Sequence, residues 1–86
     1  MNSNEEFQGW KNYETWNVAL YINNERVIYE AAKEFMKKYK GRSPYIDFTY
    51  SNIYFYKHPK TPDDVRWNSN KLSRTELNEM LFDLLD

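Results

Sequence analysis

The chain has 86 residues with no cysteine and one histidine, and its 12 basic and 13 acidic residues give a net charge of −1. These numbers exclude disulfides, cysteine nucleophiles and thiolate metal sites, and one histidine is too few for a multi-histidine zinc site. The balanced charge argues against a polybasic nucleic-acid binder. Aromatic residues make up 19% of the chain, which supplies enough apolar area for a small core.

The sequence predicts a single domain over residues 1–86, in which the polar residues 1–8 are frayed. It contains no run of about 20 apolar residues and no signal-peptide pattern. We therefore expect a cytoplasmic protein that makes no membrane contact. The residue types present also lead us to expect no metal and no cofactor.

A first helix is predicted to begin at Asn12, because asparagine is a favoured N-cap and Glu14 follows in the first turn. Tyr13, Trp16 and Leu20 recur at helical spacing, so we expect this face to point into the core. A second helix is predicted over residues 25–39. Lysines gather at its end, and a glycine at position 41 fits a helix terminus.

Residues 44–57 carry two conflicting signals. Their richness in tyrosine, phenylalanine and isoleucine favours strands, and a hairpin over about 45–57 would make the fold α+β. However, Ser43 followed by Pro44 is typical of a helix start, and Asp47 lies where the first turn favours an acid. Helix is the favoured interpretation, which gives a compact all-α domain of three to four helices.

The last helix carries the strongest local pattern. Ser73 and Glu76 form an S-x-x-E capping box, and Leu72 and Leu77 flank it as a hydrophobic staple. Trp67, just upstream, and Phe82 within this helix are expected to anchor the core.

Residues 9–20 read GWKNYETWNVAL, and this run resembles the NYETWNVALW motif of a family of small proteins found in phages, plasmids and bacterial genomes. Tyr21 stands where that motif has a second tryptophan. Residues 61–67 resemble the family's TPDGVxW, with Asp64 in place of glycine, and residues 77–80 match its LNEM. The resemblance implies a small helical protein of a mobile element, and it implies no reaction and no catalytic residues.

Two sets of residues are candidates for function. The motif set combines aromatic and polar side chains that either bind a partner or anchor a capped helix: Asn12, Tyr13, Glu14, Trp16, Asn17 and Trp67. If Asn17 is buried, it must be hydrogen-bonded. The second set is expected to contact a partner because sixteen aromatic residues exceed what one small core can hide: Tyr45, Tyr50, Tyr54, Tyr56, Lys37, Lys38, Lys40 and Arg42.

The sequence therefore predicts a non-enzymatic protein that binds a host protein or protein complex in the host cytoplasm. Inhibition of a host defence or metabolic complex by covering its surface is one form of this function, by analogy with other small accessory proteins. Homo-oligomerisation is also open. The alternative is a nucleic-acid-binding protein that uses the lysine and arginine stripe with exposed tyrosines as stacking platforms.

Overall fold

The structure is a computed structural model that describes residues 6–85. This range contains five helices: α1 (Tyr13–Asn24), α2 (Arg26–Lys38), α3 (Pro44–Ser51), α4 (Ile53–Lys57) and α5 (Arg74–Asp83). It contains no strand, only two isolated β-bridges, Phe7–Trp10 and Lys60–Arg66. The predicted all-α class is confirmed. None of these helices is long and apolar enough to cross a membrane.

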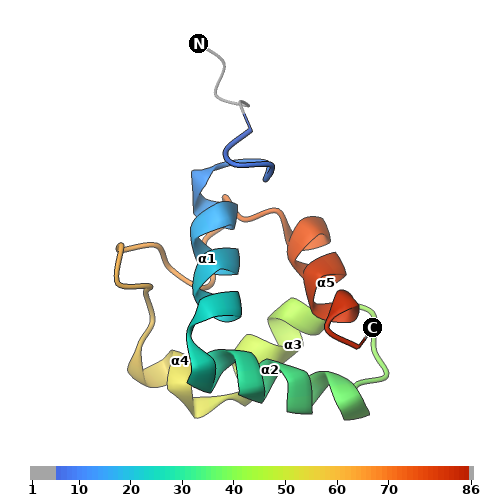
Figure 1. Cartoon of the computed structure of the whole chain (residues 1–86). Coiled ribbons are helices and arrows are strands. Elements are labelled where there is room, and N and C mark those ends of the chain that lie inside the picture. Colours follow the sequence, from blue (N-terminus) through green and yellow to red (C-terminus); the bar gives the residue numbers. More distant parts are fainter. Residues whose placement is uncertain (1–5, 86) are drawn as a thin grey trace.

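The helices form two levels (Figure 1). Helices α1 and α5 stand upright beside each other, and α2 runs across beneath them with α3 and α4 alongside it. The core fills the space between the two levels. Its buried side chains come from every helix and from the segment before α5: Val18, Ala19, Ile22, Ile28, Ala32, Met36, Tyr45, Phe48, Phe55, Val65, Trp67, Leu72, Leu77 and Leu81.

Residues 44–57 form two short helices, so the hairpin alternative is not present. Pro44 occupies the first turn of α3 as predicted, although the Ser43 side chain makes no capping hydrogen bond. The helix breaks at Asn52, where the backbone is extended and the side-chain oxygen accepts a hydrogen bond from Tyr54 N at 2.8 Å. Asparagine prefers such a cap to a helix interior, so the chain restarts as α4 in a new direction.

The inward face of α1 differs from the prediction. Tyr13 is 39% exposed and Trp16 is only half-buried, whereas Thr15 and Asn17 are fully buried. The prediction assumed that the face with the large aromatic side chains points into the core. In the structure, partners from distant parts of the chain satisfy the polar groups of Thr15 and Asn17, and these two residues therefore turn inward.

The segment before α1 is ordered by aromatic packing. Phe7 and Trp10 exchange two backbone hydrogen bonds of 2.7 and 2.9 Å. The Phe7 ring lies 4.8 Å from Trp16 and 5.3 Å from Tyr13, measured between ring centroids. Phe7, which the prediction counted among the frayed residues 1–8, therefore packs against α1, while residues 1–5 lie outside the described part of the chain.

Helix α2 ends at Lys38 without the expected glycine terminus. Tyr39 is the C-cap, and its hydroxyl donates to Asp47 Oδ2 at 2.6 Å and accepts from Ser43 N at 3.0 Å. A Cβ atom at Gly41 would collide with the Tyr39 ring. Glycine at position 41 therefore leaves room for the Tyr39 ring. The φ angle of Gly41 is not in the left-handed region, so the backbone conformation itself does not require glycine there.

Helix α5 begins at the predicted cap, but only half of the capping box forms. Glu76 N donates to Ser73 Oγ at 3.4 Å. The Glu76 carboxylate accepts from Lys11 N at 2.9 Å, and Ser73 N donates to Thr15 Oγ1 at 2.9 Å. The two groups that would close the box bind the start of α1 instead. Phe82 is 41% exposed, so its predicted place in the core is wrong.

We expect Ser73→Ala to lower the free energy of unfolding by about 0.5–1 kcal/mol, at the lower end of cap effects because the bond is long. This corresponds to a melting temperature about 2–8 °C lower. Thermal denaturation followed by circular dichroism measures the shift. An unchanged melting temperature would show that Ser73 Oγ does not stabilise α5.

Candidate functional site

The predicted contact tyrosines separate into exposed and buried groups. Tyr50 and Tyr56 are 67% and 71% exposed, and Ile53 between them is 66% exposed. Tyr54 is half-buried and packs against the core. Tyr45 is 1% exposed, so its predicted role as a contact residue is wrong. Its side chain lies in the core, and its hydroxyl donates to Trp67 O at 2.6 Å.

A groove of about 200 Å³ opens beside the exposed tyrosines. We call it the tyrosine groove. It is lined by α3 and α4 on one side and by the following loop on the other: Thr49, Tyr50, Phe55, Tyr56, Pro59, Arg66, Trp67 and Asn68. Trp67 N donates to Pro59 O at 3.2 Å, and the bridge between Lys60 and Arg66 pairs the two arms of the loop. This pairing holds the second side of the groove in place.

Trp67 connects this groove to the core. Its ring is 3% exposed and lies 4.9 Å from the Phe55 ring, edge to face. The predicted place of Trp67 in the core is confirmed. Its Nε1–H is buried without a hydrogen-bond partner among the described residues. A buried donor without a partner destabilises the folded state by about 1–3 kcal/mol. Most buried polar groups in proteins do have a hydrogen-bond partner, so Trp67 Nε1 is an exception.

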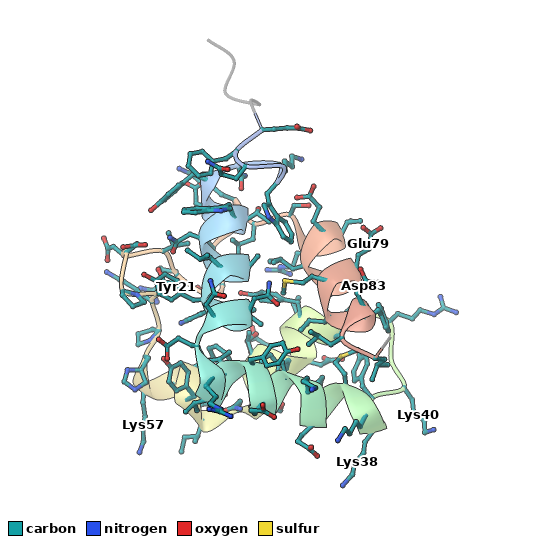
Figure 2. All side chains as sticks on the ribbon, in the orientation of Figure 1. Tyr21, Lys38, Lys40, Lys57, Glu79 and Asp83 are labelled. Carbon is teal, nitrogen blue, oxygen red and sulfur yellow. The ribbon has the colours of Figure 1, made fainter. Side chains whose placement is uncertain are left out.

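The predicted basic contact residues lie away from the tyrosine groove. Lys37, Lys38, Lys40 and Arg42 are exposed at the end of α2 and in the loop after it. Figure 2 shows Lys38 and Lys40 at one end of the lower level and Lys57, which ends α4, at the other end. Lys37 pairs with Glu34 at 3.0 Å. The structure therefore does not bring these cations together with Tyr50 and Tyr56.

The motif residue Asn12 joins the start of α1 to the segment before α5. Asn12 caps α1, since its Oδ1 accepts from Thr15 N at 2.8 Å and from Thr15 Oγ1 at 2.6 Å. Its Nδ2 donates to Lys71 O at 2.7 Å. Glu14 is half-buried in the first turn, as the helix dipole favours. These contacts fasten α1 to the segment that leads into α5.

Asn17 is fully buried at the centre of a second network. Its Oδ1 accepts from Thr61 Oγ1 at 2.6 Å, and its Nδ2 donates to Asp63 Oδ2 at 2.8 Å and, at 3.4 Å, to the Tyr13 hydroxyl. Tyr21 donates its hydroxyl to the same Asp63 oxygen at 3.1 Å. Desolvation, followed by this hydrogen bond, raises the pKa of Tyr21. The motif residues therefore hold the loop after α4 against α1.

Asp64 occupies the position where the resembling family has glycine. Its φ is +73°, in the left-handed region that glycine adopts most easily. Thr61 Oγ1 accepts hydrogen bonds from Asp63 N and Val65 N, both at 3.2 Å, and Thr61 O accepts from Asp64 N at 2.8 Å. These bonds keep the turn in this conformation with an aspartate at its tip.

Two other hollows of the surface are larger and more polar than the tyrosine groove. One of about 610 Å³ is lined by Tyr13, Glu14 and residues 63–66 and 68–71, and one of about 420 Å³ lies between Trp10 and the acidic side of α5. Glu79 and Asp83 mark the second one in Figure 2. Within residues 6–85, no group of three or more histidine, aspartate or glutamate side chains could hold a metal ion.

Sequence reasoning found the tyrosines of the groove but missed its other side. Pro59, Arg66 and Asn68 belong to a loop, and no periodic pattern marks their orientation. The available signal was the resemblance of residues 61–67 to TPDGVxW. That motif ends on Trp67, and a tryptophan buried in the core sets the positions of its chain neighbours Arg66 and Asn68.

No curated protein and no solved structure matches this chain significantly. The sequence model of one family, described as a family of unknown function, matches residues 3–86. This match covers nearly the whole chain, including all three motif segments and every lining residue of the tyrosine groove. The chain belongs to this family, DUF7249.

Proposed function

We propose that this chain is a non-enzymatic protein-binding protein and that its contact surface is the tyrosine groove together with Ile53. One observation carries the proposal: Tyr50, Ile53 and Tyr56 are each about two-thirds exposed on adjoining turns of α3 and α4. Leaving three large apolar side chains in water is unfavourable, and such patches mark interaction sites. Tyrosine is also enriched in protein interfaces, because it combines large contact area with a hydroxyl group.

The test is affinity capture from a lysate of the natural host, with quantitative mass spectrometry. We expect a protein enriched by the wild-type chain to be enriched about tenfold less by the double variant Tyr50→Ala/Tyr56→Ala. Phe82→Ala is the matched control, since it removes an aromatic ring that is also exposed but lies on α5. Equal enrichment by the double variant, with an unchanged melting temperature, would contradict the proposal.

The proposed setting is a phage or other mobile element, with action in the host cytoplasm against a host defence or metabolic complex. The resemblance of residues 9–20 to the NYETWNVALW motif is its support. A small protein that covers the surface of a larger complex needs no catalytic residues. This agrees with a chain that has no cysteine and whose one histidine lies exposed beside Tyr54.

Nucleic-acid binding is the alternative proposal, and the exposed cations Lys38, Lys40 and Arg42 support it. The aromatic residues nearest to them in sequence do not offer open stacking faces. Tyr39 stacks on Phe35 with ring centroids 5.1 Å apart, and Tyr45 is buried. Single-strand binding combines cations with stacking platforms, so this alternative has less support than the protein-binding proposal.

A further inference from the structure

We infer that the chain pairs with a second copy of itself, and that the basic segment over residues 37–42 of one copy occupies the hollow between Trp10 and α5 of the other. We call this hollow of about 420 Å³ the acidic hollow. Its lining combines three carboxylates with three apolar side chains: Trp10, Glu76, Glu79, Met80, Asp83 and Leu84. The inference goes beyond the proposed function, because the acidic hollow shares no lining residue with the tyrosine groove.

The carboxylates of the acidic hollow favour a cationic occupant. Glu76, Glu79 and Asp83 follow one another at helical spacing, so they lie on one face of α5, where like charges repel. None of the three forms an ion pair among residues 6–85, and no lysine, arginine or histidine lines the hollow. A cation that enters the hollow therefore relieves a repulsion as well as forming new pairs.

The apolar part of the lining favours a long basic side chain over an inorganic cation. Trp10, Met80 and Leu84 are half-buried and pack against the core, so they offer apolar surface beside the carboxylates. Lysine and arginine combine an apolar stem with a charged head, and tryptophan is the aromatic side chain that attracts such a head most strongly. No group of three or more acidic or histidine side chains within the described range could hold a metal ion.

Residues 37–42 form a segment of the matching chemistry. They read KKYKGR, with four cations in six residues and no acid. Lys38, Lys40 and Arg42 are exposed and form no ion pair in the described part of the chain. The hydrogen bonds of the Tyr39 hydroxyl, 2.6 and 3.0 Å long, tie the segment to α3 and its N-cap, so binding requires little further ordering of the backbone. Every copy of the chain supplies one hollow and one such segment.

A two-fold arrangement allows two copies to make this contact twice. Figure 2 shows Glu79 and Asp83 on the same side of the view as Lys40, although no ion pair joins them within the described residues of one chain. Half a turn can therefore set each hollow against the basic segment of the other copy, as in a self-complementary dimer interface. The net charge of −1 leaves little overall repulsion between copies. Exposed ion pairs are individually weak and screened by salt, so we expect a weak, salt-dependent dimer.

The test is sedimentation equilibrium of the whole chain over a range of concentrations. At low salt we expect the average mass to rise toward that of a dimer as the concentration increases. Raising the salt from about 0.05 M to about 0.5 M should weaken the dimer about tenfold, because the charges of the contact are then screened.

Charge reversal locates the contact. Glu79→Lys/Asp83→Lys and Lys38→Glu/Lys40→Glu should each weaken self-association about tenfold, because each variant places like charges across the contact. The variant with all four substitutions keeps the wild-type net charge and should dimerise again, since the two surfaces have exchanged the signs of these charges. This recovery separates a specific contact from an effect of overall charge.

Lys57→Glu/Glu30→Lys is the matched control. It also keeps the net charge, and it exchanges two exposed charges that lie outside the acidic hollow and the basic segment. We expect it to dimerise like the wild type. Unchanged melting temperatures of all variants establish that they are folded.

Three results would overturn the inference: a monomer at every concentration up to about 1 mM, dimerisation that neither charge reversal weakens, or no recovery in the variant with four substitutions. A monomer whose Trp10 indole signal shifts in NMR with a capped peptide of residues 37–42 would assign the acidic hollow to a basic segment of another protein. Dimerisation that survives both reversals but is lost in Tyr50→Ala/Tyr56→Ala would place the contact at the tyrosine groove instead.

Discussion

Asn17→Leu is expected to lower the free energy of unfolding by about 2–4 kcal/mol, which corresponds to a melting temperature at least about 8 °C lower. Leucine has a similar size but no polar atoms. Thr61 Oγ1 would lose the acceptor that lies 2.6 Å away inside the protein, and Asp63 would lose the amide donor at 2.8 Å. Thr61 is 3% exposed, so water cannot replace the lost partner without opening the loop.

Chemical denaturation of the wild type and two variants measures this effect. Asn24→Leu is the matched control: the same substitution at the exposed last residue of α1 should change the free energy of unfolding by less than about 0.5 kcal/mol. A difference below about 1 kcal/mol between Asn17→Leu and the wild type would show that the buried network does not hold the loop. Because that loop carries Pro59 and Trp67, we also expect Asn17→Leu to loosen the tyrosine groove.

The helix starts were predictable because their causes are local. The caps at Asn12 and Ser73 each involve a residue three positions later, so the sequence displays both partners together. The broken helix at Asn52 was less predictable, since the same tyrosine-rich run satisfies strand and helix spacing. Only its packing along the core decides between them, and that packing depends on α2 and α5.

The buried side of α1 could not be predicted, because the groups that stabilise it lie far away in the chain. Thr15 and Asn17 would be unfavourable inside the protein without Ser73 N and Thr61 Oγ1, which are 58 and 44 residues away. Sequence spacing carries no signal for such pairs. The aromatic residues expected to anchor the core, Tyr13 and Trp16, instead pack edge to face against Phe7.

The exposed tyrosines of the candidate site could be predicted from the sequence, but the groove beside them could not, because it depends on a distant segment of the chain. The surplus of tyrosine indicated that some rings must be exposed, and Tyr50 and Tyr56 are. Which ones are exposed depends on the phase of α3, which places Tyr45 inside, and on the break at Asn52, after which α4 sets the directions of Tyr54 and Tyr56. The groove itself exists only because the loop over residues 59–68 returns to pack against α3 and α4.

The free energy of unfolding is expected to fall above pH 10 because of Tyr45. Burial raises the pKa of Tyr45 far above its ordinary value of 10.0, and the charge of Arg74 opposes this only in part. In the unfolded chain the phenol ionises near pH 10, while in the folded protein it stays neutral. Its stabilising contribution is therefore complete below that pH and is lost as the pH rises, by up to about 1.4 kcal/mol per pH unit.

Tyr45→Phe separates this titration from other alkaline effects. At neutral pH the variant should be less stable by about 1–2 kcal/mol, since Trp67 O loses the hydroxyl that donates to it at 2.6 Å. Above pH 10 its stability should fall less steeply than that of the wild type, because the buried phenol is gone. A smaller slope should remain, since desolvation and hydrogen bonds to Asp63 and Asp47 also raise the pKa values of Tyr21 and Tyr39.

Denaturation curves across the alkaline range give both slopes, and Tyr50→Phe is the matched control because its ring is 67% exposed. We expect this control to follow the wild type at every pH. Equal slopes for the wild type and Tyr45→Phe would mean that Tyr45 ionises in the folded protein as readily as in the unfolded chain. The Tyr45 hydroxyl would then have access to water, which would contradict its burial and its hydrogen bond to Trp67 O.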